Sequence, residues 1–160
     1  MSQSDAARQL LRHSLATLAY RGGKAVRGAP DSFSDFHASP ETRTPGQILA
    51  HIGDLLDWAL SMARGQKQWH DSEPVPWPGE VRRFFAALEA FDAYLASDNP
   101  LQAPAEKLLQ APVADALTHV GQIALLRRLA GTPIRAENYY VAKIAIGSVS
   151  ADQAAPVYEF

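Results

Sequence analysis

Apolar residues recur at the three- and four-residue spacing of an α-helix in four long segments, and no segment alternates polar and apolar residues as a β-strand does. The predicted core helices cover about residues 4–26, 44–65, 79–98 and 112–130. A tail, 131–160, follows them and contains one predicted short helix near 137–146. An amphipathic helix has to bury its apolar stripe against a neighbour. The pattern therefore predicts an all-α fold, a four-helix bundle that forms a single domain over residues 1–160.

The second predicted helix has the clearest boundaries. Thr44 can cap it, Pro45 suits the first helical position, and Gln47 stands three residues after Thr44 as in a capping box. Gly65 marks its end, because glycine readily adopts the left-handed conformation that closes a helix. These signals place the start of this helix more firmly than that of any other.

The connections between the predicted helices are long. Each could cross along the length of a helix, so loop length alone leaves both up-down-up-down and crossed arrangements open. Phe33 and Phe36 in the first connection need burial, and we expect that loop to pack over one end of the bundle. The third connection is expected to contain a short helical turn within 101–110.

The composition limits the classes of partner. Charged residues make up 20% and hydrophobic residues 47% of the chain, as in ordinary globular proteins. The formal net charge is -2 and the basic residues are spread along the chain, so we expect no nucleic-acid partner. The absence of Cys excludes disulfides, thiolate catalysis and Cys-based metal sites. No stretch has the length of a membrane span and no signal peptide is evident, so we expect a cytoplasmic protein with no membrane partner.

A histidine lies in the middle of the apolar stripe of the second helix. The residues that share one narrow arc of this helix are Ile48, His51, Leu55, Trp58 and Met62. A histidine on such a face is desolvated, and its ring nitrogens need partners. One interpretation is a core histidine that hydrogen-bonds to a backbone carbonyl or a carboxylate. The other is a metal ligand.

The fourth helix presents two further candidate ligands. Asp115 and His119 are four residues apart, so both side chains can converge on one point beside the helix, and Gln122 follows on the same face. Together with His51 on a facing helix they supply two imidazoles and a carboxylate. This set suits a divalent transition metal with open coordination positions. Gln122 could orient a ligand or contact a substrate. The alternative for Asp115 is a structural one, because a carboxylate in the first turn interacts favourably with the helix dipole.

Other polar and aromatic residues have weaker claims. The remaining histidines are expected to be solvated surface residues: His13, His37 and His70. Arg127 and Arg128 are expected to complement the dipole of their own helix. Trp58 and Tyr139 are candidates to line a substrate pocket, although plain packing of Tyr139 against the bundle is the alternative.

Two stretches of sequence lie on the helices that carry the candidate ligands. The first is Thr44-Pro45-Gly46-Gln47-Ile48-Leu49-Ala50-His51-Ile52. The second comprises His119-Val120-Gly121-Gln122 and Leu126-Arg127-Arg128-Leu129. In their residues and their order these stretches resemble the DinB-like (DinB/YfiT) superfamily, a group associated with metal-dependent enzymes. The resemblance covers most of the chain, from about residue 5 to residue 130.

The resemblance implies a bundle of up-down-down-up topology with a metal site near one end, usually occupied by nickel or zinc. It also implies three histidine ligands, one of which matches His51, while the other two form an H-x-x-x-H pair on the last helix. The second histidine of that pair matches His119, but the first falls at Asp115, where this sequence departs from the pattern. Because Asp ligates zinc, nickel, manganese and iron, the substitution leaves two alternatives, a harder metal site or the loss of tight metal binding.

The leading hypothesis is a metal-dependent transferase or hydrolase that acts on a small molecule and binds one divalent ion through His51, Asp115 and His119. Relatives of known activity include thiol-dependent transferases and isomerases, so the resemblance implies a low-molecular-weight thiol as a candidate cosubstrate, whose pKa a metal would lower. The alternative is a non-catalytic bundle that has lost its metal and binds a small ligand or a partner protein. In that case Asp115 would pair with a histidine and raise the pKa of that histidine. A homodimer is compatible with either hypothesis.

Overall fold

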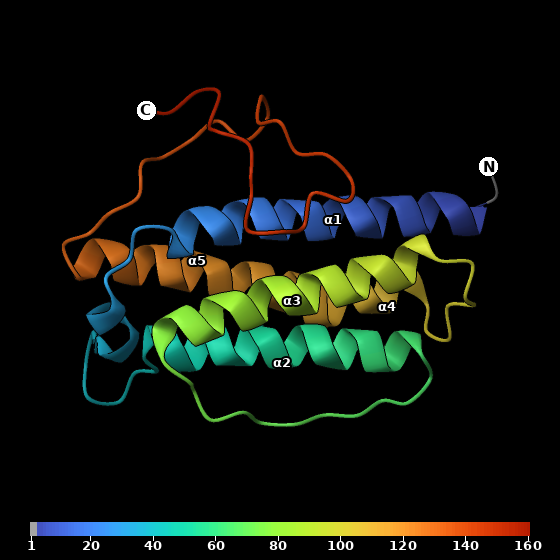
Figure 1. The fold of residues 1–160 in the computed structure, drawn as a ribbon, viewed down its shortest axis with the longest axis horizontal. Coiled ribbons are helices and arrows are strands. Elements are labelled where there is room, and N and C mark those ends of the chain that lie inside the picture. Colours follow the sequence, from blue (N-terminus) through green and yellow to red (C-terminus); the bar gives the residue numbers. More distant parts are fainter. Residues whose placement is uncertain (1–2) are drawn as a thin grey trace.

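The computed structural model of the protein describes residues 3–160 and is built from helices alone (Figure 1). The elements are α1 (Gln3–Val26), the 3-10 turn η1 (Asp31–Asp35), α2 (Pro45–Ala63), α3 (Trp77–Ala96), the short α4 (Ala105–Leu108), the π-helical segment η2 (Leu109–Val113) and α5 (Ala114–Leu129). Within these residues there is no strand, only an isolated bridge between Glu137 and Glu159. The predicted all-α class is confirmed. Residues 1 and 2, which the single-domain prediction includes, lie outside the described part of the chain.

The ends of α2 follow from local sequence signals, as predicted. The Thr44 hydroxyl accepts a hydrogen bond from the Gln47 amide, and the Gln47 side chain accepts one from the Thr44 amide, which completes the capping box. At the other end Gly65 has a φ of 79°, the left-handed conformation that favours glycine. These two ends fix the length of the helix that carries His51.

Contacts between side chains and backbone show how the helices run. α2 and α3 run parallel to each other, and α1 and α5 run in the opposite direction to both (Figure 1). The contacts that fix these directions are Arg83–Ala50, Tyr94–Ala63, Arg12–Asp92 and Arg127–Ala25. Each of α1 and α2 packs against both α3 and α5, so α1 and α2 occupy opposite corners of the bundle.

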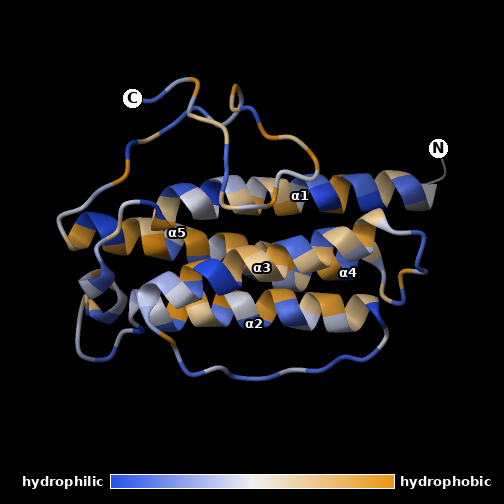
Figure 2. Cartoon of the chain, viewed as in Figure 1, coloured by the Kyte–Doolittle hydropathy of each residue, from blue (hydrophilic) through white to orange (hydrophobic). Residues whose placement is uncertain are grey.

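The core lies between the four long helices, where Figure 2 shows the hydrophobic faces turned toward one another. Phe84 and Phe91 of α3 and Leu56 of α2 are among its fully buried side chains. A Cβ atom added at Gly22 would lie 2.5 Å from Cζ of Phe84, so this glycine allows α1 to approach α3 closely. Among residues 3–160, no helix is both long enough and apolar enough to serve as a membrane span.

The first connection packs over one end of the bundle, as expected. Phe33 in η1 is buried and meets Trp77, at the start of α3, edge-on with the ring centroids 5.4 Å apart. The Phe36 ring stacks beside it at 6.5 Å. The expected turn in the third connection is also present, as α4.

The helical backbone from α4 to α5 is interrupted by a π turn rather than by a loop. Pro112 lies within η2 and cannot donate a hydrogen bond, and the Ala114 amide points to the carbonyl of Leu109, five residues earlier. Leu108 and Val113 are both fully buried although they are five residues apart. In an unbroken α-helix this spacing would place them on different faces. The wider turn therefore keeps both side chains in the core.

The prediction of a short helix near 137–146 is wrong. The tail lies over α1 (Figure 1), and its backbone hydrogen bonds join segments of the tail to each other: Asn138 donates to Tyr158 and Phe160 donates to Ala136. Glu137 is buried and receives the Tyr20 hydroxyl at 2.6 Å and Lys24 Nζ at 2.6 Å. These tertiary contacts hold the segment against α1 in turns and irregular backbone, which overrides its local helical propensity.

Candidate metal site

The three predicted ligands come together between α2 and α5. His119 Nε2 lies 3.4 Å from Asp115 Oδ1, and His51 Nε2 lies 3.9 Å from Asp115 Oδ2. The two imidazole rings are nearly perpendicular, with centroids 4.9 Å apart. One donor atom from each residue lies within 4.8 Å of the others, which is close enough for all three to bind one ion. The antiparallel packing of α2 and α5 brings the residues together, as the sequence predicts.

Gln122 orients one of the imidazoles. Its side-chain oxygen lies 2.8 Å from Nδ1 of His119, so the imidazole tautomer with its proton on Nδ1 donates to Gln122 and leaves a lone pair on Nε2. In this tautomer the lone pair faces the Asp115 carboxylate. A cation between the two groups, either a proton or a metal ion, would interact favourably with both. The expected role of Gln122 in orienting a ligand agrees with this geometry.

His51 is held in the neutral form that binds metals. Its side chain is 20% exposed. Burial lowers the pKa of His51, and electrostatic interactions with the neighbouring His119 and Arg43 lower it further, against smaller opposing effects of Asp115 and Asp54. The non-catalytic alternative expects a carboxylate to raise the histidine pKa. The shift at His51 has the opposite sign.

Asp115 has no compelling structural role in the helix. It lies in the first turn of α5, as expected, but the backbone enters that turn already helical from α4 and η2. The dipole interaction considered for Asp115 therefore lacks a free helix end. Its side chain is 49% exposed, so it is not a buried partner of either histidine. Its position supports a role as a ligand.

Aromatic residues flank the cluster on α2 and on the loop after it. Trp69 packs edge-on against His51 at 5.8 Å and against Trp58 at 5.7 Å. Trp58 and Asp115 also line a cavity of about 370 Å³, and the substrate-pocket role of Trp58 stays a prediction. Tyr139 does not join the site. Its ring packs against Tyr20 and beneath the Arg21 guanidinium on α1, which is the packing alternative.

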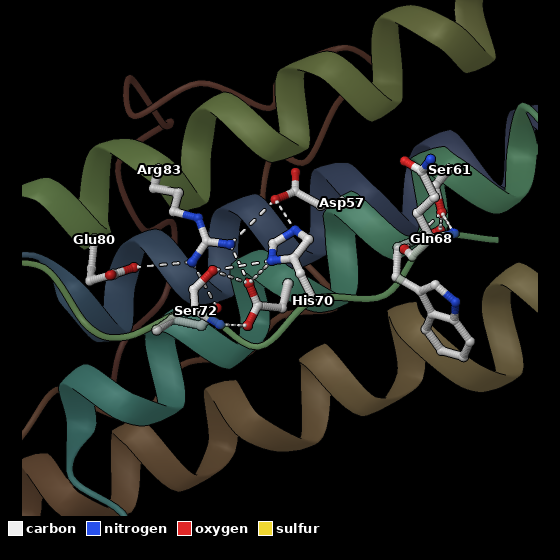
Figure 3. A network of polar contacts seen from close by, with 10 residues as sticks. Asp57, Ser61, Gln68, His70, Ser72, Glu80 and Arg83 are labelled. Atoms are coloured by element: carbon white, nitrogen blue, oxygen red, sulfur yellow. Dashed lines mark hydrogen bonds and ion pairs between the residues drawn. The ribbon is translucent and has the colours of Figure 1, made fainter. Parts of the chain in front are cut away.

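A second polar cluster lies beside the first and was not predicted (Figure 3). His70 Nδ1 lies 3.0 Å from Asp54 Oδ1, and His70 Nε2 lies 3.3 Å from Asp57 Oδ2, so His70 is a paired residue rather than a purely solvated one. Arg83 of α3 contacts the same two carboxylate oxygens. Since the guanidinium already contacts the atoms that a metal would use, this cluster is an ion-pair network, and the first cluster is the better candidate for binding a metal.

The network holds the loop between α2 and α3 along the surface of α2. Ser72 donates to both Asp54 oxygens, from its amide at 2.9 Å and from its hydroxyl at 2.7 Å. Gln68 exchanges two hydrogen bonds with the Ser61 hydroxyl. Trp69 lies between these attachment points in the sequence, so the loop, residues 64–76, places an indole ring beside His51. No periodic signal in the sequence indicates this path.

Replacing Asp54 with asparagine is expected to release this loop. The Asp54 side chain is 2% exposed, and although burial raises its pKa, hydrogen bonds from Ser72 and Arg83 outweigh that effect and lower it. Loss of the charge should reduce the free energy of unfolding by about 1–3 kcal/mol. It should also shift tryptophan emission to longer wavelength as Trp69 becomes solvated. Asp71→Asn, an exposed change in the same loop, is the control. Unchanged stability and emission in Asp54→Asn would show that the network does not hold the loop.

His51 is expected to titrate below 6.5, the ordinary histidine value, in the metal-free protein. As the pH falls from 6.5 toward the folded-state pKa, the unfolded chain takes up a proton that folded His51 does not, so the free energy of unfolding decreases. NMR titration of the ring signals measures the midpoint, and His51→Gln should lose this part of the pH dependence of stability. A midpoint above the ordinary value would instead favour a charged Asp115–His51 pair.

Comparison of the chain with models of known families, with curated proteins and with solved structures finds no match.

Proposed function

We propose that this protein is a metal-dependent enzyme of the DinB-like kind, which binds one divalent transition-metal ion through His51, Asp115 and His119. The observation that carries the proposal is the convergence of three donor atoms from two helices within 4.8 Å. Gln122 holds the His119 ring with its lone pair toward the shared centre. The burial that lowers the pKa of His51 keeps that ring neutral and able to coordinate.

The sequence resemblance and the helix directions support the same proposal. In chain order, the four long helices run up, down, down and up, which is the topology that the resemblance implies. His51 on α2 and His119 on α5 stand at two of the positions where the resemblance implies histidine ligands. Asp115 replaces the third histidine at a position where its carboxylate faces both of them. Two imidazoles and a carboxylate suit zinc or nickel and also admit manganese or iron.

Three protein ligands leave coordination positions for a small molecule. A bound metal would supply Lewis acidity, lowering the pKa of a water molecule or of a substrate thiol. The protein's own contribution is to fix the three ligands and to shape the surroundings. Gln122 favours one tautomer of His119, and Trp69, which packs against Trp58, covers one side of His51. We infer a hydrolytic or group-transfer reaction on a small substrate.

Metal content is the measurement that tests this proposal. Purified protein from metal-supplemented medium, analysed by elemental mass spectrometry, is expected to contain about one equivalent of one transition metal. A chelator should remove the metal. Asp115→His should retain the metal or bind it more tightly, because it restores a third imidazole. His70→Ala, which alters only the neighbouring ion-pair network, should leave the metal content unchanged.

An empty wild-type protein would contradict the proposal. If that protein gained metal on Asp115→His, the chain would be a bundle whose site has lost its metal, as the non-catalytic hypothesis states. Metal that persists in a His51→Ala variant would place the ion elsewhere. The ion-pair network around Asp54 would then be the first place to look.

A further inference from the structure

A groove runs along the exposed side of α5 beside the candidate metal site. Its volume is about 450 Å³, and it extends from His119 to Leu129, the last residue of the helix. Among the residues that line it, Leu125 and Leu129 are 53% and 57% exposed, while Leu126 and Ile48 are buried. The lining of the groove is therefore mainly apolar and includes His119, one of the three candidate metal ligands.

Arg43 supplies the positive charge of this groove. The residue precedes α2, is exposed and lines the groove together with Ile48. Within the part of the chain that the structure describes, Arg43 has no ion pair and no hydrogen-bond partner. Arg43 lines the same groove as His119, so it lies close to the candidate metal site as well as to the leucines. An unpaired guanidinium beside an apolar channel is complementary to a molecule with one anionic group and one apolar part.

We propose that the groove binds a small anionic amphiphile, with its apolar body along Leu125, Leu126 and Leu129 and its carboxylate or equivalent anion at Arg43. The inference rests on the proposed function, because it names the substrate class of the same site. The polar group would lie near His119, where an ion could reach it. The cavity beside Trp58 and Asp115 has no cationic side chain in its lining and does not suit an anion.

A second copy of the chain is a less suitable occupant than a small molecule. The groove is concave and contains His119 and Gln122, so a partner seated in it would cover a metal ligand and the residue that orients that ligand. In such a contact, no acidic residue has been identified that would pair with Arg43. The shape and the charge both favour a small ligand.

Octanoate is a suitable probe, because it combines an apolar chain with one carboxylate. Binding would be measured by NMR chemical shifts of the α5 amides in chelator-treated protein, so that the carboxylate cannot bind through a metal. Octanol tests the apolar body without the charge, and butyrate tests the charge with a shorter body. Octanoate should bind more tightly than octanol, because only octanoate carries a charge that pairs with Arg43. It should also bind at least about ten times more tightly than butyrate, because each additional buried methylene increases the affinity.

Variants separate the two halves of the proposed ligand site. Arg43→Gln should weaken octanoate binding about three- to tenfold and leave octanol binding unchanged. Leu125→Asp should weaken the binding of both octanoate and octanol. Because Leu125 is exposed, this variant should still fold. The control variants are Arg82→Gln and Leu10→Asp, which change exposed residues on α3 and α1 and should have no effect.

Two results would overturn the inference. One is equal binding of octanoate and octanol with no effect of Arg43→Gln, which would leave the groove without a role for charge. The other is a dimer in light scattering that Leu125→Asp or Leu129→Asp dissociates, which would make the groove an interface between copies. Because the assay uses metal-free protein, an absence of metal binding would count against the proposed function alone, and an absence of octanoate binding against this inference alone.

Discussion

Replacing His119 with alanine is expected to weaken zinc or nickel binding by roughly 100-fold or more. Loss of an outer group that merely orients a ligand already costs 10- to 100-fold in metal affinity, so loss of the ligand itself should reach at least the upper end of that range. His119 contributes the Nε2 that faces Asp115 at 3.4 Å and whose lone pair Gln122 maintains. Competition with a chelating dye measures the affinity directly.

The control for this change is His70→Ala, which removes an imidazole from the neighbouring network without touching the three proposed ligands. Helical circular dichroism should be the same in both variants, since neither histidine belongs to the apolar core. If His119→Ala keeps the wild-type affinity, the assignment of the metal site to this cluster is wrong.

Replacing Arg127 with methionine is expected to lower the free energy of unfolding by about 2–4 kcal/mol. Arg127 is 5% exposed, and its guanidinium donates to the carbonyls of Ala25, in the last turn of α1, and of Arg27, just after it, each at 3.0 Å. Its Nε donates to the Thr132 carbonyl at 2.8 Å. Methionine keeps much of the apolar stem but leaves the buried Ala25 carbonyl and its two neighbours without this donor. Urea unfolding measures the change.

Arg128→Met is the matched control for Arg127→Met. Arg128 is the next residue on α5 and is exposed, so its replacement should change the free energy of unfolding by no more than about 0.5 kcal/mol. The sequence predicts that both arginines complement the dipole of their own helix. The structure shows instead that Arg127 closes the end of α1. Equal effects of the two variants would contradict that role.

The features that the sequence predicts correctly are those with local signals. Helical periodicity and the Thr44–Gln47 capping box locate the long helices and the start of α2. The four-residue spacing of Asp115 and His119 places these two side chains on one face of α5. The helix ends, the capping box and this pair depend on residues that are close in sequence. The approach of His51 depends in addition on the packing of α2 against α5.

The features that the sequence did not predict depend on contacts between distant residues. The loop of residues 64–76 follows α2 because the Ser61 hydroxyl and the Asp54 carboxylate of α2 bind it, and Arg83 of α3 pairs with the same carboxylate. The tail stays in turns and irregular backbone because buried Glu137 pairs with Tyr20 and Lys24 of α1, more than one hundred residues earlier. Such polar contacts have no period, so they leave no pattern along the chain.

The π turn of η2 sets the rotation of α5 relative to α4 about their common axis, and so determines which side chains of each helix face the core. Leu108, just before this turn, and Val113, its last residue, both reach the core only because the turn accommodates one extra residue. Removing a single residue there would rotate one side relative to the other by about 100°. Either Leu108 would leave the core, or α5 would turn and carry Asp115 and His119 away from His51. The length of this segment, more than its composition, thus sets the direction in which the two α5 ligands point.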